Sequence, residues 1–119
     1  MPVKFHKNIF LNTIKKYNPD IILGIGQCAR GNIIRIERKA SNLKKTQYKL
    51  VNLKLKKNKY SRISYNAGSF VCNFSMYVIL DYIKNKKIKF AFIHIPHNYD
   101  LSKSIKFIES KIYEARNSK

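Results

Sequence analysis

Cys72 occupies a position that favours nucleophilic chemistry. It follows the small-residue turn Ala67-Gly68 and lies at the start of an apolar run from Phe70 to about Lys84. Ser69 can cap that run as a helix, because its hydroxyl can accept a hydrogen bond from an unpaired amide of the first turn. The other unpaired N–H groups and the helix dipole favour a thiolate over a thiol there. The pattern is therefore typical of a cysteine nucleophile.

A lone cysteine on an apolar helix is more often a small buried hydrophobic residue, so a chemical role needs further groups. His94 stands near the end of the apolar run from Lys89 to Ile95, which predicts a buried strand that Pro96 stops. Glu37, one of only six acidic residues, lies inside a second apolar run. A thiol, an imidazole and a carboxylate at the edges of strands or helices make a candidate nucleophile, base and orienting acid.

Three other reactive side chains compete with these candidates. His97 follows Pro96 and is expected in an exposed loop, and His6 is expected on the polar side of a first helix. Cys28 lies in a loop with no metal-ligand spacing around it. We therefore expect no metal and no cofactor.

The periodicity of apolar residues predicts an alternation of helices and strands. Helices are predicted at 5–17, at 70–84 and from Asp100 or Ser102 onward, and strands at 21–27, 32–42, 48–55, 61–65 and 89–95. The strand at 21–27 looks buried on both faces, and the one at 48–55 looks exposed. The core face of the last helix is predicted to be Leu101, Ile105, Ile108 and Ile112. This order predicts one layered α/β domain over residues 1–119, with its sites at strand ends.

Composition sets the broad class of the protein. At 119 residues and 45% apolar content the chain is expected to form one globular domain with a modest core. No apolar run approaches the ~20 residues that cross a membrane, and the N-terminus lacks the pattern of a secretory signal. Two cysteines do not make a disulfide framework. These features predict a cytoplasmic protein that does not bind membranes.

The formal net charge of +19 has two interpretations. One is a protein that binds nucleic acid or another anionic surface. The other is compositional drift, because lysine, asparagine and isoleucine are all abundant and the lysines are spread along the chain. No nucleic-acid-reading motif accompanies the lysines, so the sequence favours drift and no specific nucleic-acid partner.

Four stretches in order resemble the pyroglutamyl peptidase I family of cysteine peptidases. Tyr17 to Gln27 is similar to the family's helix end, strand and Gly-Gln loop, and Ile36 to Asn42 to the segment with its active-site glutamate. Ser64 to Asn73 is similar to the family's cysteine motif, and Phe92 to Pro96 to its histidine motif. The resemblance covers nearly the whole chain, to about Lys111.

The resemblance implies a function and a set of residues. Cys72 would be the nucleophile, His94 the base and then the acid, and Glu37 the residue that orients the imidazole. Phe70 and Val71 would line an apolar pocket for the pyroglutamyl ring, and Gln27 is placed near that pocket. The family releases N-terminal pyroglutamate from peptides through an acyl-enzyme, so pyroglutamylated peptides are the expected substrates.

The resemblance also implies a three-layer α/β/α fold with a mixed, mostly parallel sheet, of the phosphorylase/hydrolase-like kind. The match begins after the family's usual N-terminal strand, and the stretch between Glu37 and Cys72 is shorter than in the family. Arg35 and Lys39 depart from the family's pattern, and Lys39 is expected to bring charge to a core position. Two outcomes stay open: an active peptidase, as a homo-oligomer or with a complementing chain, or a catalytically impaired relative that acts as a basic binding protein.

Overall fold

The computed structural model describes residues 16, 19–28, 32–42, 46–65 and 71–117, apart from the side chains of Cys28, Val71 and Cys72. The predicted helix at 5–17 lies outside the described residues, except that Lys16 is helical. The elements are β1 (Ile21–Cys28), β2 (Ile34–Glu37), β3 (Lys39–Ser41), β4 (Tyr48–Leu50), β5 (Ser61–Ser64), α2 (Val71–Ile83), β6 (Lys89–Pro96) and α3 (Leu101–Asn117). Among the described helices, none is long and apolar enough to cross a membrane.

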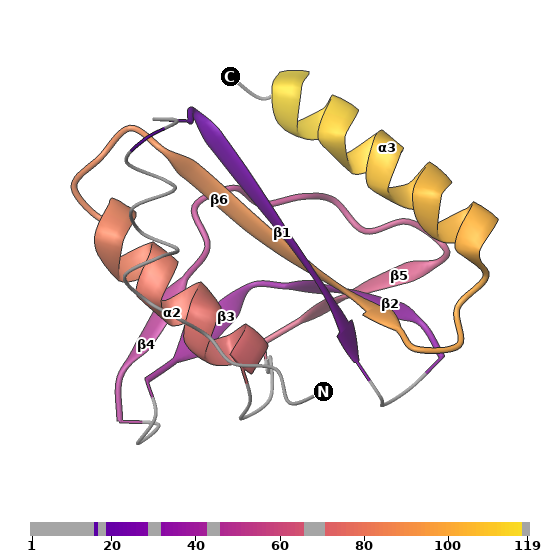
Figure 1. Ribbon diagram of the computed structural model, residues 1–119, viewed down its shortest axis with the longest axis horizontal. Coiled ribbons are helices and arrows are strands. Elements are labelled where there is room, and N and C mark those ends of the chain that lie inside the picture. Colours follow the sequence, from indigo (N-terminus) through magenta and orange to yellow (C-terminus); the bar gives the residue numbers. More distant parts are fainter. Residues whose placement is uncertain (1–15, 17–18, 29–31, 43–45, 66–70, 118–119) are drawn as a thin grey trace.

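A four-stranded mixed sheet lies between the two helices (Figure 1). Its strand order is β1-β6-β2-β5. β1 pairs in parallel with β6 and β2 in parallel with β5, whereas β6 and β2 pair antiparallel. Two of these three pairings are parallel, so the prediction of a mixed, mostly parallel sheet is confirmed.

β6 divides its side chains between two hydrophobic cores. Phe90 and Phe92 pack with the residues of α2, whereas Ala91 and Ile93 pack with those of α3. The division follows from the period of a strand, in which successive side chains point to opposite faces. The two helices consequently cover opposite faces of the sheet (Figure 1), and the predicted three-layer α/β/α architecture is confirmed.

The strand predicted at 32–42 is in fact two strands that belong to different sheets. Arg38 separates them: its backbone N–H donates to the Ser64 carbonyl at 2.7 Å, and its Nη2 donates to the Leu55 carbonyl at 2.6 Å. After this residue β3 pairs antiparallel with β4, and the small hairpin packs against α2. Arg38 therefore joins the two sheets, because its backbone N–H bonds the end of β5 and its carbonyl accepts from the Val51 N–H, just after β4, at 3.0 Å.

Lys39 does not carry its charge into the core. The residue is half-buried at the start of β3. Its ammonium lies 4.5 Å from the centre of the Tyr48 ring on the paired strand β4. The aromatic face attracts the cation, so the departure from the family's pattern is accommodated at the edge of the hairpin.

The prediction of an exposed strand at 48–55 is mostly wrong. Only β4 is a strand, and the chain beyond it is irregular and contributes to both cores through the buried side chains of Val51, Leu53 and Leu55. The side chain of Asn52 replaces strand-to-strand hydrogen bonds there. Its Nδ2 donates to the Ile88 carbonyl, and its Oδ1 accepts from the Phe90 backbone N–H at the start of β6. An irregular segment can be buried when its polar groups find such partners.

β1 is less buried than its apolar sequence predicted. Its side chains range from half-buried to exposed, and Ile25 is 48% exposed. Within the described part of the chain β1 has a neighbouring strand on one side alone, β6, and so stands at the edge of the sheet. The prediction of burial on both faces is therefore wrong here.

The prediction of which face of the last helix, α3, meets the core is also wrong. The buried residues are Ser104, Phe107, Lys111 and Ala115, and of the predicted face Ile108 alone packs against the core. Leu101, Ile105 and Ile112 are 75%, 47% and 43% exposed. Helical spacing located an apolar stripe correctly, but the sheet contacts the neighbouring side of the helix, which carries the buried residues.

Candidate active site

His94 and Glu37 form a buried pair at the centre of the sheet. Nδ1 of His94 lies 2.6 Å from Oε2 of Glu37, and the two side chains are 4% and 0% exposed. They come from antiparallel neighbours, β6 and β2, in which Glu37 lies opposite Phe92, and Arg35 opposite His94. A diagonal contact of this kind joins residues that lie 57 positions apart in the chain.

The surroundings hold the imidazole in one orientation. The ring of Phe92 meets that of His94 edge to face, with 5.1 Å between ring centres. An ionised carboxylate accepts hydrogen bonds without donating any, so its contact places the proton of a neutral imidazole on Nδ1. Nε2 is then the nitrogen that can accept a proton from another group. This is the arrangement that a general base requires.

Arg35 is a third ionisable member of this buried group. Its Nε lies 3.7 Å from the same carboxylate oxygen, Oε2 of Glu37, and its side chain is 9% exposed. Among the described residues, neither Nε of Arg35 nor Oε1 of Glu37 has a hydrogen-bond partner. The guanidinium offsets the charge of a fully buried carboxylate. The sequence marked Arg35 as a departure from a family pattern and did not place it in the site; its spacing of two from Glu37 on one strand was the available signal.

Cys72 is the second residue of α2, so its predicted place in the first turn of a helix is confirmed. Its side chain and that of Val71 lie outside the described part of the structure, as do Phe70 and the predicted cap Ser69. α2 covers the sheet face that carries Phe90 and Phe92. The same face carries His94, which follows Phe92 by two positions along β6.

Asn73 anchors the first turn of α2 to the rest of the fold. Its Oδ1 accepts from the Ser41 backbone N–H at 2.9 Å, and its Nδ2 donates to the Ser41 carbonyl at 3.0 Å and to the Ser41 hydroxyl at 3.1 Å. Both residues are buried. Asn73 follows Cys72 directly, so this contact sets where the cysteine backbone lies. Sequence reasoning placed Asn73 in a motif but assigned it no role.

Gln27 is not brought to the His94–Glu37 pair. It lies on β1 opposite Ile95, one position beyond Gly26, which lies opposite His94. Residues paired in parallel strands share a face, so Gln27 belongs to the α3 side of the sheet and His94 to the α2 side. Gln27 is also exposed. Its predicted place near the substrate pocket stays a prediction.

The competing residues are placed as follows. His97 is exposed, just beyond the end of β6. His6 and the side chain of Cys28 lie outside the described residues. Among the residues that the structure describes, no group of three or more histidine, cysteine, aspartate or glutamate side chains is placed to hold a metal ion.

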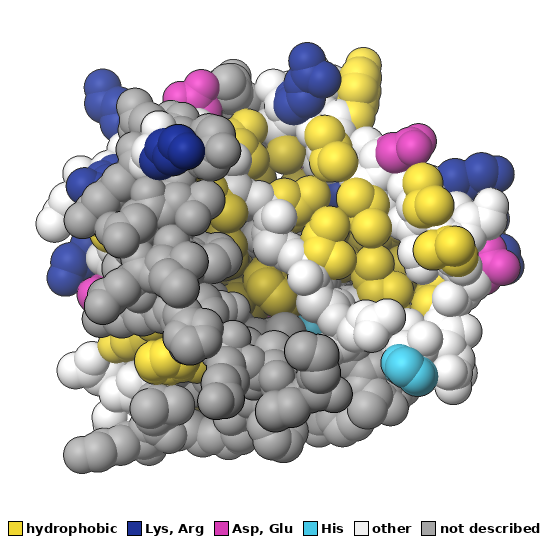
Figure 2. Space-filling model, viewed as in Figure 1, with side chains coloured by type: hydrophobic (Ala, Val, Ile, Leu, Met, Phe, Trp, Pro, Cys, Tyr) yellow, Lys and Arg dark blue, Asp and Glu magenta, His cyan; other side chains and the backbone are white. Residues whose placement is uncertain are grey.

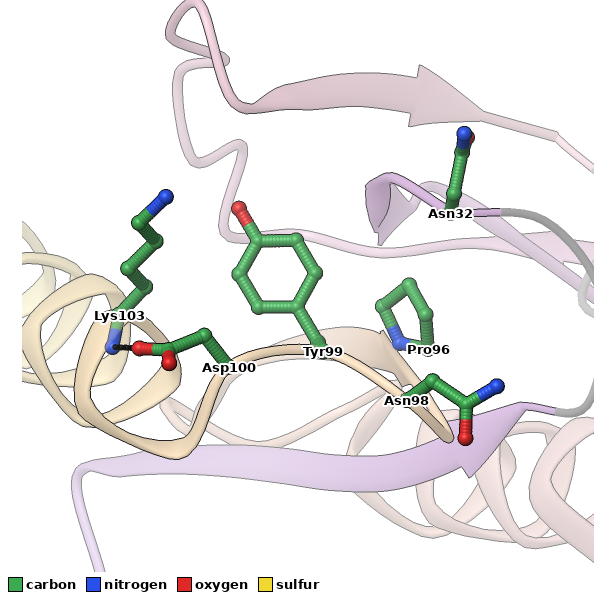
Figure 3. Close-up of a pocket in the computed structure, with 6 residues that line it drawn as sticks. All are labelled: Asn32, Pro96, Asn98, Tyr99, Asp100 and Lys103. Carbon is green, nitrogen blue, oxygen red and sulfur yellow. Dashed lines mark hydrogen bonds between the residues drawn. The ribbon is translucent and has the colours of Figure 1, made fainter.

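A pocket lies beyond the carboxyl end of β6, where the chain turns into α3 (Figure 3). Its lining residues are Asn32, Pro96, Asn98, Tyr99, Asp100 and Lys103. The Asp100 side chain is engaged at the helix start, because its Oδ2 accepts from the Lys103 backbone N–H at 2.9 Å. None of the six is a predicted site residue, so the pocket does not contain the His94–Glu37 pair.

Comparison with known proteins gives a consistent set of relatives. Residues 48–106 match the family described as pyroglutamyl peptidase. Pyrrolidone-carboxylate peptidase 1 of Caldanaerobacter subterraneus subsp. tengcongensis is 32% identical, over 82% of this chain and 64% of its own length. The corresponding protein of Vibrio campbellii is 28% identical, over 81% of this chain and 59% of its own length. The chain thus spans less than two thirds of the length of these relatives.

Solved structures resemble the fold described above. Pyroglutamyl peptidase I of Bacillus amyloliquefaciens superimposes with a TM-score of 0.65 and 28% identity, over 76% of this chain and 58% of that one. A mutant pyrrolidone carboxyl peptidase of Pyrococcus furiosus gives a TM-score of 0.66 at 22% identity, over 81% and 62% of the two chains. The second likeness concerns the fold alone.

Proposed function

The chain belongs to the pyroglutamyl peptidase family, and on that premise we propose that it is a cysteine hydrolase that removes the N-terminal pyroglutamyl residue from peptides. The observation that carries the proposal is the buried contact between His94 and Glu37. A histidine and a glutamate buried together near the helix that carries Cys72 in its first turn are the base and orienting acid that a thiol nucleophile needs.

In the proposed mechanism Cys72 attacks the carbonyl carbon of the pyroglutamyl residue. Nε2 of His94 takes the thiol proton, and Glu37 holds the imidazolium through Nδ1. The tetrahedral oxyanion accepts hydrogen bonds from backbone N–H groups at the start of α2. His94 then donates the proton to the leaving amine, which leaves a thioester on Cys72.

Water completes the proposed cycle. Nε2 of His94 removes a proton from water as the oxygen attacks the thioester carbonyl. The carbon–sulfur bond breaks, the thiolate recovers the proton, and pyroglutamate leaves as the free acid. Phe70 and Val71 would form the apolar slot for the uncharged lactam ring, with Gln27 near it. No metal or cofactor takes part in any of these steps.

The first test is the release of a fluorescent amine from a pyroglutamyl amide. Cys72→Ala should abolish turnover, whereas Cys28→Ala, the matched change at the other cysteine, should leave it unchanged. Glu37→Gln keeps the size of the side chain but removes its charge, and a change of this kind in a serine triad lowers kcat by about 10⁴-fold. The matched change Glu109→Gln, on the exposed surface of α3, should have no effect.

A second readout does not depend on the substrate. A thiolate-forming Cys72 should react with iodoacetamide at neutral pH much faster than Cys28 does. A folded chain with no turnover and two equally slow cysteines would refute the hydrolase proposal. It would favour the other candidate, a relative that binds anionic partners through its +19 charge.

A further inference from the structure

Arg35 is a buried basic side chain that the proposed mechanism does not use. Among the described residues, the buried basic side chains are those of Arg35 and Lys111. The Lys111 ammonium bonds Glu114 and a backbone carbonyl, whereas Nε of Arg35 has no hydrogen-bond partner in the same part of the chain. Its contact with Glu37 is an ion pair at 3.7 Å, longer than a hydrogen bond. What Arg35 brings to this site is therefore its charge.

The other positive charges of the protein are better screened. On the face that Figure 2 shows, lysine and arginine side chains lie mainly around the periphery, where water surrounds them. Arg62 lies opposite Arg35 in the pairing of β2 with β5, but its side chain is exposed. Exposed charges act weakly on a buried group, because water and salt screen them. Arg35 is therefore the described cation that acts most directly on the His94–Glu37 pair.

The elements packed on this side of the sheet bring other ionisable groups. β1 contributes Gly26 opposite His94, and the hairpin contributes Lys39, which lies over Tyr48. Asp81 of α2 is exposed and pairs with lysines at 3.5 Å. The other ionisable side chains of α2 are those of Tyr77, which bonds Gln47, the half-buried Tyr82, and Cys72, whose thiol lies outside the described part of the structure. Among the described side chains, the buried charges on this side are thus those of Arg35 and Glu37, beside His94.

A count of charges shows which form of His94 this group favours. With Arg35 and Glu37 both ionised, the three side chains are neutral overall when the imidazole is neutral, and they carry one net positive charge when it is protonated. Without Arg35, the pair would carry one net negative charge with a neutral imidazole and none with an imidazolium. A buried net charge is costly. Arg35 therefore favours the neutral imidazole.

We propose that Arg35 balances the charge of Glu37 and so keeps His94 in its neutral, proton-accepting form near neutral pH. Arg35 is a positioning residue, because it acts on His94 through Glu37. Its role in turnover rests on the proposed peptidase function, since a base must be neutral to take the proton of a thiol. Its effect on the protonation of His94 does not rest on that function.

The expected effect is a shift in the titration midpoint of His94, the pH at which half of the rings are protonated. An imidazole in water has its midpoint near pH 6.5. Burial and Arg35 both oppose the imidazolium, so the midpoint of His94 should lie below about 6.5. A charged neighbour within about 4–6 Å moves such a midpoint by about 1–3 pH units. Loss of the Arg35 charge should therefore raise the midpoint by at least about one unit, which is a tenfold change in the protonation equilibrium.

Nitrogen-15 NMR of the imidazole ring, recorded across a pH titration, measures this midpoint. Cys72→Ala serves as the parent chain, because it removes the charge of the thiol. In that chain Arg35→Met keeps an unbranched stem and removes the charge, so the midpoint should rise. Arg35→Lys keeps a positive charge and should stay closer to the parent. The matched control is Arg62→Met, at the exposed position opposite Arg35 on β5, and it should leave the midpoint unchanged.

Several results would overturn the proposal. One is an equal midpoint in the parent and in Arg35→Met, and another is an equal rise in Arg62→Met. If Arg35→Met fails to fold, the parent chain decides alone, because a His94 midpoint above about 6.5 contradicts the charge count.

Activity tests the role of Arg35 in turnover separately. With Cys72 intact, Arg35→Met should move the acidic limb of kcat/KM to higher pH by the shift that NMR measures, and an unchanged limb would overturn this role. A chain without turnover would refute the peptidase proposal, whereas the NMR titration would still decide whether Arg35 controls the protonation of His94.

Discussion

Replacing Asn73 by alanine removes the side chain that ties the first turn of α2 to β3. The change deletes three hydrogen bonds to Ser41, at 2.9, 3.0 and 3.1 Å, and both residues are buried. The backbone N–H and carbonyl of Ser41 are left facing an apolar methyl group. We therefore expect this substitution at a buried position of the first helical turn to destabilise the fold as a core substitution does.

The magnitude follows from the number of bonds. A typical buried hydrogen bond contributes about 1 kcal/mol to stability, and an unpaired buried group costs about 1–3 kcal/mol. Three lost bonds, with partial relaxation of the two orphaned backbone groups, give a decrease of about 3 kcal/mol in the free energy of unfolding. Ser41→Ala removes only the hydroxyl contact and keeps both backbone bonds, so it should cost about 1 kcal/mol or less.

Urea unfolding of the parent chain, Asn73→Ala and Ser41→Ala measures both values. Asn98→Ala, at an exposed position, is the control for loss of an asparagine. If Asn73→Ala changes the free energy of unfolding by less than about 0.5 kcal/mol, the surface-like range, these bonds do not anchor α2. The reasoning would also be refuted if Ser41→Ala were as damaging as Asn73→Ala.

Two further substitutions test the packing on either side of the sheet. A methyl group at Gly24 would overlap the ring of Phe92. Gly24→Ala should therefore lower the free energy of unfolding by about 1–3 kcal/mol through overpacking. Thermal melts should show that Phe92→Leu in the same chain recovers part of the loss. Lys111→Met keeps the buried stem of the side chain but removes an ammonium that bonds Glu114 and a backbone carbonyl. It should lower the free energy of unfolding by about 1–3 kcal/mol. A urea midpoint equal to that of the exposed-site control Lys106→Met would contradict this.

Local patterns in the sequence predicted the elements that have one dominant period. The strand with His94 and the helix with Cys72 were predicted to within a residue or two, because an apolar run with a clear stop at each end needs no distant partner to identify it. The sequence also identified Glu37, since an acid inside an apolar run has to be paired once it is buried. Local reasoning failed at residues 32–42 and 48–55, where Arg38 and Asn52 form bonds with distant backbone groups.

The sequence by itself determined which side chains can perform chemistry and which stretches are apolar enough to be buried. Only the tertiary structure decided that β2 runs antiparallel to β6, and this pairing brings Glu37 to His94. It also decided which stripe of α3 meets the sheet and left Leu101, Ile105 and Ile112 outside. The physical reason is that periodicity reports which face of an element is apolar, whereas strand order and long-range hydrogen bonds decide what that face meets.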